Sequence, residues 1–171
     1  VVMDTGTRRG LVSSAYNERR EQCETAAHHF HVKALRDVSV EQFKAHENEL
    51  DDLTRRRARH VITENARTLA AYDAMIAGDA RVLGALMDAS HESLQYDFEV
   101  SAAALNTIVA IARRHPACYG ARMTGAGFGG CAVALVRSDA AEDFVAGLYD
   151  GRGHLVAADH AAARLLVVEQ P

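Results

Sequence analysis

The glycine-rich stretch at residues 119–131 is the part of the sequence whose residue types point most directly to chemistry. It contains five of the twelve glycines, namely Gly120, Gly125, Gly127, Gly129 and Gly130. Glycine adopts positive φ without steric cost and lets a ligand or another backbone approach closely. Successive backbone N–H groups in such a loop can bind an anion without a charged side chain. The stretch is therefore either an anion-binding loop or a tight structural bend.

The loop matches the pattern G-x-G-x-x-G from Gly125 to Gly130, but its surroundings argue against two common uses of that pattern. A dinucleotide-binding loop is followed by a helix, whereas residues 131–136 (Cys-Ala-Val-Ala-Leu-Val) form a short apolar run that predicts a strand. A P-loop ends in Gly-Lys-Ser or Gly-Lys-Thr, and this stretch contains no lysine. We therefore expect a glycine-rich connection between two strands.

Histidines and arginines provide weaker candidates. His28, His29 and His31 lie close together, but no neighbouring carboxylate or cysteine completes a tetrahedral set, so we expect a solvated helix end and no metal site. Arg59 and residues 55–57 form a basic run flanked by acidic residues, which is typical of an exposed helix face. His91 beside Glu92 is expected to form hydrogen bonds between helices rather than to act in acid–base catalysis.

Length and composition favour one folded domain. The chain has 171 residues, of which 49% are hydrophobic, so it can bury a core. Its net charge is −4, from 19 Lys and Arg against 23 Asp and Glu, which gives no reason to expect a nucleic-acid partner. No apolar run approaches the roughly 18 residues of a membrane span, so no membrane partner is expected.

Two further features concern the environment of the protein. The three cysteines lack C-x-x-C spacing, which favours reduced thiols and a cytoplasmic location. The sequence begins without methionine and inside a predicted strand, at residues 1–5, so we expect it to be part of a longer protein. If so, it should expose an apolar surface where the rest of that protein packs.

The elements that position the glycine-rich stretch are mostly helices before it and strands around it. A capping box from Ser39 to Gln42, Gly78 at a helix C-terminus, and N-caps at Asp79 and Ser101 mark helix ends. Val61, Leu69, Tyr72 and Ile76 are expected to form the buried stripe of the longest helix. The predicted helices cover residues 16–31, 40–50, 53–77, 79–94, 102–115 and 139–149, and the predicted strands 1–5, 119–124, 131–137, 154–158 and 164–169. This order predicts an α+β fold, with helices packed on an antiparallel sheet.

Four spaced segments resemble the GHMP small-molecule kinases, in the galactokinase form of the family. Residues 120–131 (Gly-Ala-Arg-Met-Thr-Gly-Ala-Gly-Phe-Gly-Gly-Cys) resemble the third conserved motif of that family. Residues 14–23 contain a pattern similar to Tyr-Asn-x-Arg-Arg-x-Gln-Cys. Residues 57–65 resemble its Arg-Ala-Arg-His-Val helix, and residues 86–94 its Leu-Met-x-x-Ser-His-x-Ser-Leu segment, continued by residues 99–101.

The resemblance implies that residues 1–171 form a GHMP kinase C-terminal domain with a ferredoxin-like fold. It implies ATP-dependent phosphorylation of galactose at the C1 hydroxyl, with ATP and Mg²⁺ held mainly by an N-terminal domain that this sequence lacks. The sequence contains neither the Gly-Leu-Ser-Ser-Ser phosphate loop nor the aspartate that the family places beside the sugar hydroxyl. We therefore expect the chain to be inactive by itself, with galactose, ATP and the N-terminal domain as its partners.

The resemblance also assigns roles to a few residues. Tyr16 matches a tyrosine whose hydroxyl binds the sugar, although a core aromatic residue is the alternative interpretation. Arg8 matches an arginine on the nucleotide side. The motif loop, expected to face the transferred phosphate, comprises Thr124, Gly125, Ala126, Gly127, Phe128, Gly129 and Gly130. Three other functions stay open: another GHMP sugar kinase such as an N-acetylgalactosamine kinase, a galactokinase-like sugar sensor without turnover, and a structural module that pairs with a partner.

Overall fold

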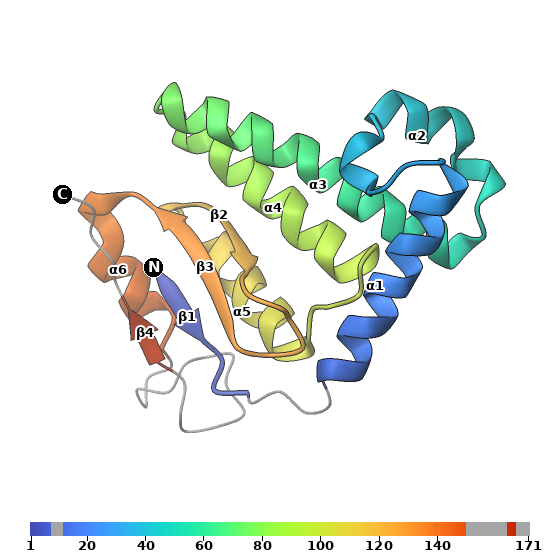
Figure 1. Ribbon diagram of the computed structural model, residues 1–171. Helices are drawn as coiled ribbons and strands as arrows, with labels where there is room; N and C mark the ends of the chain where they lie inside the picture. Colours follow the sequence, from blue (N-terminus) through green and yellow to red (C-terminus); the bar gives the residue numbers. More distant parts are fainter. Residues whose placement is uncertain (8–11, 150–163, 167–171) are drawn as a thin grey trace.

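The computed structural model of the chain describes residues 1–7, 12–149 and 164–166 (Figure 1). Within these described residues, four strands form one antiparallel sheet in the order β2-β3-β1-β4. The strands are β1 (Val2–Asp4), β2 (Cys118–Met123), β3 (Cys131–Val136) and β4 (Arg164–Leu166). The helices are α1 (Val12–His29), α2 (Val40–His46), α3 (Asp52–Ile76), α4 (Ala80–Tyr96), α5 (Ala103–Arg114) and α6 (Ala141–Gly147). This arrangement confirms the predicted α+β fold, and the β-α-β-β-α-β order is that of ferredoxin-like folds.

The sheet is built around the first strand of the chain. In β1, Met3 pairs with Ala132 of β3 on one side and with Leu165 of β4 on the other. Strands β2 and β3 pair directly across the glycine-rich connection, with Met123 opposite Ala132. The strand predicted at residues 164–169 is thus confirmed for β4, while the one predicted at 154–158 lies outside the described residues.

Among the described residues, two hydrophobic cores hold the helices. The first lies between the sheet and helices α4, α5 and α6, and its fully buried members include Met3, Leu105, Ile108, Met123 and Phe144. The second lies away from the sheet, where α1 and α2 pack on the first half of α3, and includes Ala26, Phe43, Ala58 and Ile62. Figure 1 shows α3 and α4 as an antiparallel pair that spans both regions.

Most predicted helix ends are confirmed by their hydrogen bonds. The side chain of Ser39 accepts from the Gln42 N–H at 3.2 Å, and the Gln42 side chain accepts from the Ser39 N–H at 2.9 Å. Gly78 has φ +67°, and Asp79 then caps α4. The predicted cap at Ser101 is wrong. Helix α5 begins after Ala102, and the Ser101 hydroxyl instead donates to the Asn106 side chain at 2.6 Å.

The predicted buried stripe of α3 is also wrong. Leu69, Tyr72 and Ile76 are 70%, 61% and 74% exposed. The C-terminal half of α3 lies beside α4 alone (Figure 1), so this face of the helix has no covering element among the described residues. The residues that α3 does bury are mostly polar or small, namely Thr54, Arg57, Ala58, His60, Ile62 and Ala74. None of the described helices is long and apolar enough to cross a membrane.

Candidate functional site

The connection between β2 and β3 follows a path that requires glycine. The φ angles of Gly125, Gly127, Gly129 and Gly130 are +80°, +84°, +128° and +88°. Side chains other than glycine rarely adopt this region because Cβ clashes with the backbone. Phe128 is the exception within the loop, with φ +60°. The backbone path of the loop therefore requires these glycines. This requirement is compatible both with an anion-binding loop and with a tight structural bend.

Hydrogen bonds hold the loop at its start, where the Thr124 N–H donates to the Cys131 carbonyl at 2.9 Å, and along its second half. The Phe128 N–H donates to the Val100 carbonyl at 2.7 Å, and the Gly130 N–H donates to the Thr7 carbonyl at 3.2 Å. The Thr5 hydroxyl donates to the Gly130 carbonyl at 2.7 Å. Within the described part of the chain, no acceptor is assigned to the backbone N–H groups of Gly125, Ala126, Gly127 and Gly129. Gly125 and Ala126 are exposed, whereas Gly127 and Gly129 are buried, so the first two N–H groups are the ones accessible to an anion such as a phosphoryl group.

The structure brings Tyr16 and the loop together at one cavity of about 270 Å³. Gly125, Ala126 and Phe128 line it from the loop. Thr124, Gly127, Gly129 and Gly130 belong to the same loop but are not among the lining residues. Helix α1 contributes Tyr16, Arg19, Arg20 and Cys23, and the remaining wall consists of Leu94, Phe98 and Val100. Tyr16 is 61% exposed, so it is not a core aromatic residue and its hydroxyl is accessible to a ligand.

The lining residues limit the chemistry of this cavity. No Asp or Glu is among them, so the described part of the cavity offers no carboxylate as a general base. Burial raises the pKa of the Cys23 thiol, which opposes formation of a nucleophilic thiolate. Across the described residues, no three His, Cys, Asp or Glu side chains are arranged to hold a metal ion. The cavity is therefore suited to binding and orienting a ligand rather than to supplying a reactive group.

A cluster of arginines holds residues 97–100, the segment that contributes Phe98 and Val100 to the wall of this cavity. Arg57 is 2% exposed, and its guanidinium donates to the Asp97 carbonyl, the Glu99 carboxylate and the Gln22 side chain. Hydrogen bonds from Arg57, and to a smaller extent from Arg56, lower the pKa of the Glu99 carboxyl to about 2. The prediction that residues 55–57 form an exposed basic face is therefore wrong for Arg57. Glu99 lies 42 positions from Arg57 in the sequence, so residue spacing alone could not identify the Arg57–Glu99 pair.

Two buried histidines support the same region from α3 and α4. The Met123 N–H, directly before the loop, donates to His91 Nδ1 at 3.2 Å. His60 Nδ1 lies 3.0 Å from the Ser93 hydroxyl, and its ring stacks on Phe98 with centroids 4.5 Å apart. Burial lowers the pKa of both histidines to about 4, so both are neutral at pH 7. The sequence predicted a hydrogen bond between helices for His91, whereas its Nδ1 accepts from strand β2 instead.

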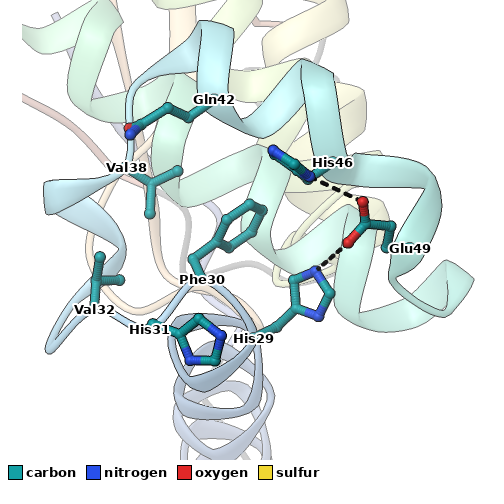
Figure 2. Close-up of a pocket in the computed structure, with 8 residues that line it drawn as sticks. All are labelled: His29, Phe30, His31, Val32, Val38, Gln42, His46 and Glu49. Atoms are coloured by element: carbon teal, nitrogen blue, oxygen red, sulfur yellow. Dashed lines mark hydrogen bonds and ion pairs between the residues drawn. The ribbon is translucent and has the colours of Figure 1, made fainter.

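A second hollow, of about 320 Å³, lies where α1 ends against α2 (Figure 2). Glu49 lies between two histidines there, with its carboxylate 3.4 Å from His29 Nε2 and 2.9 Å from His46 Nδ1. His31 lines the same hollow, whereas His28 is exposed and not among its lining residues. The sequence indicated a solvated helix end, and it did not reveal that Glu49 and His46 would meet His29. Arg8, expected on the nucleotide side, lies outside the described residues.

Comparison with known proteins gives the family. Residues 71–150 match the model of the GHMP kinases C-terminal family. The crystal structure of Lactococcus lactis galactokinase complexed with galactose is 39% identical with a TM-score of 0.81, and the match covers 85% of this chain. The crystal structure of L. major mevalonate kinase in complex with R-mevalonate is 25% identical with a TM-score of 0.57, over 93% of this chain. In both cases the match covers 39% of the other chain, so this chain spans well under half of either relative. The resemblance of the four sequence segments is thus confirmed, and the chain belongs to the GHMP kinase family through its C-terminal domain.

Proposed function

We propose that this chain forms the C-terminal part of a galactokinase, which phosphorylates galactose at its C1 hydroxyl at the expense of ATP. One observation supports this most strongly: Tyr16 and the open glycine loop line a single cavity. The 39% identity to a galactokinase, against 25% to a mevalonate kinase, favours a sugar as the phosphoryl acceptor. The domain assignment of residues 1–171 as one C-terminal domain is part of this proposal.

The residues of this chain would bind and orient the reactants. The accessible Tyr16 hydroxyl can exchange a hydrogen bond with a sugar hydroxyl, while Phe98 and Phe128 give the cavity apolar walls. The open N–H groups of the loop are suited to the oxygens of the transferred phosphoryl group. ATP would supply that phosphoryl group. The described lining residues offer no carboxylate for Mg²⁺, so we place the metal, and most contacts to ATP, outside this chain.

The isolated chain should not turn over. Phosphoryl transfer depends on positioning and on stabilisation of charge at the phosphate oxygens. The cavity has the Tyr16 hydroxyl, the guanidinium groups of Arg19 and Arg20 and backbone N–H groups, but no described carboxylate base or set of metal ligands. We therefore expect no galactose-dependent ADP release by the isolated chain in a coupled assay. Activity comparable to that of a full-length galactokinase would contradict this.

A chimera tests the proposed galactokinase activity itself. Fusing this chain to the part of the L. lactis galactokinase that it does not match, about 61% of that protein, should restore galactose-dependent ADP release. Turnover with N-acetylgalactosamine in preference to galactose would instead indicate another GHMP sugar kinase. Binding of galactose and ATP without turnover would indicate a sensor.

A further inference from the structure

Glu99 has a backbone conformation that a glutamate rarely adopts. Its φ is +54°, in the left-handed region, where glycine or asparagine would be less strained. Such strain persists only where the surroundings enforce it. Both carboxylate oxygens of Glu99 are engaged, one by Arg56 and the other by Arg57. The side chain, rather than the backbone, is therefore the reason that this position is not glycine.

The arginine partners connect Glu99 to two helices. Arg57 belongs to α3, and besides Glu99 it donates to Gln22 of α1 at 2.9 Å. Arg19 of α1 donates to the carbonyls of Phe98 at 2.6 Å and of Glu99 at 3.2 Å. Residues 97–100 are thus held from α1 and α3 at once. Since α1 also carries Tyr16, the same contacts are linked to the Tyr16 wall of the cavity.

The next carbonyl along the chain touches the glycine loop. Val100 accepts the hydrogen bond from the Phe128 N–H at 2.7 Å. Gly127 lies so close to the same carbonyl that a Cβ atom there would be 2.1 Å from the Val100 oxygen. A shift of Val100 would therefore move the loop, because the contact leaves no space for independent movement.

We propose that Glu99 and Arg57 are positioning residues that set the placement of the glycine loop relative to Tyr16. They act through residues 97–100 and touch neither sugar nor phosphate. The catalytic consequence rests on the function proposed above, whereas the effect on loop conformation does not. The pair thus has a role beyond stabilising the contact between α3 and the connection from α4 to α5.

Glu99→Gly separates positioning from stability. Glycine accommodates φ +54° without strain, which offsets part of the lost ion pair, while the link to Arg57 is removed. We expect the amide NMR signals of Gly125, Gly127 and Phe128 to shift in this chain, and the Phe128 N–H to exchange with solvent faster. Asp139→Asn, which removes a carboxylate from the exposed Arg137–Asp139 pair, is the matched control and should leave all three signals in place. Unchanged loop signals in a folded Glu99→Gly variant would overturn the proposal.

A second variant and a kinetic readout complete the test. Glu99→Gln keeps the shape and one acceptor oxygen, so it should shift the loop signals in the same direction by a smaller amount. In the chimera, Glu99→Gly should lower kcat by roughly 10- to 100-fold, as displacements of about 1 Å do, with a smaller change in the KM for galactose. If Glu99→Gly lowered the free energy of unfolding but left the kcat of the chimera unchanged, the role of Glu99 would be purely structural. If the unmodified chimera has no activity, the proposed function fails, and the NMR signals still decide the role of Glu99.

Discussion

A Cβ atom on Gly120 would lie 2.0 Å from the carbonyl oxygen of Gly84, so the backbones of β2 and α4 are in direct contact. The reverse also holds, since a Cβ on Gly84 would lie 2.1 Å from the Tyr119 carbonyl oxygen. Gly120 therefore serves helix–strand packing, unlike the loop glycines with which it is grouped in the sequence. This contact places α4, and with it His91, against the strand that leads into the loop.

We predict that Gly84→Ala and Gly120→Ala each destabilise the protein by about 3 kcal/mol or more, because a backbone carbonyl has to move to make room. Gly78→Ala is the matched control. Gly78 has φ +67°, but a Cβ added there would meet no atom within 4 Å, so only the backbone strain of about 1 kcal/mol applies. Urea unfolding measures all three variants. A loss at Gly120 no greater than that at Gly78 would contradict the packing role.

We predict that Gly127→Ala displaces the loop, since its Cβ would meet the Val100 carbonyl oxygen at 2.1 Å and φ is +84°. In the chimera, galactose-dependent kcat should fall on the order of 100-fold. Gly78→Ala carries the same type of backbone strain away from the loop and should leave kcat unchanged. Similar kcat values for the two variants would show that the loop tolerates movement.

We predict that Tyr16→Phe raises the KM for galactose in the chimera by about tenfold, the usual effect of losing one hydrogen bond to an uncharged group. The free energy of unfolding should hardly change, because the side chain is largely exposed. Tyr72→Phe is the control, because Tyr72 is also 61% exposed but lies in the C-terminal half of α3 and does not line the cavity. Equal KM values for the two variants would remove Tyr16 from the proposed sugar site.

We predict that stability declines as the pH falls from 6.5 to about 4. The pKa of His60 and of His91 is about 4 in the folded chain and 6.5 when unfolded, so the unfolded chain binds more protons within that window. One pKa unit corresponds to about 1.4 kcal/mol, so each histidine accounts for roughly 3 kcal/mol of this loss. His91→Gln should flatten the dependence measured by urea unfolding, and the exposed His28→Gln should not. A pH dependence identical in both variants would contradict the burial of a neutral His91.

Local patterns predicted much of the fold. The structure confirms three features that depend on residues within a few positions of each other. They are the capping box at Ser39, the glycine at position 78 that follows the end of α3, and the β2–β3 hairpin. The helix predicted at residues 102–115 is also confirmed by α5, which buries Leu105, Ile108, Val109 and Ala112. These features depend on backbone chemistry and on spacing, both of which are visible in the sequence.

The misjudged features depend on which surfaces meet. The pattern of Leu69, Tyr72 and Ile76 gives a face of α3, but nothing in the sequence says that no described element covers it. Arg57 is buried because Gln22, Asp97 and Glu99 surround it, and these residues come from three separate segments. The approach of Tyr16 to the glycine loop is a contact of the same long-range kind. Only the family resemblance suggested that the two belong to one site.

The most direct test of the proposed function is the rate of ADP release by the chimera with and without galactose. We predict clear stimulation by galactose, abolished when the present chain is omitted and weakened by Gly127→Ala. A folded chimera that binds ATP but shows no galactose-dependent ADP release would contradict the proposal that this domain forms one wall of a galactose kinase site.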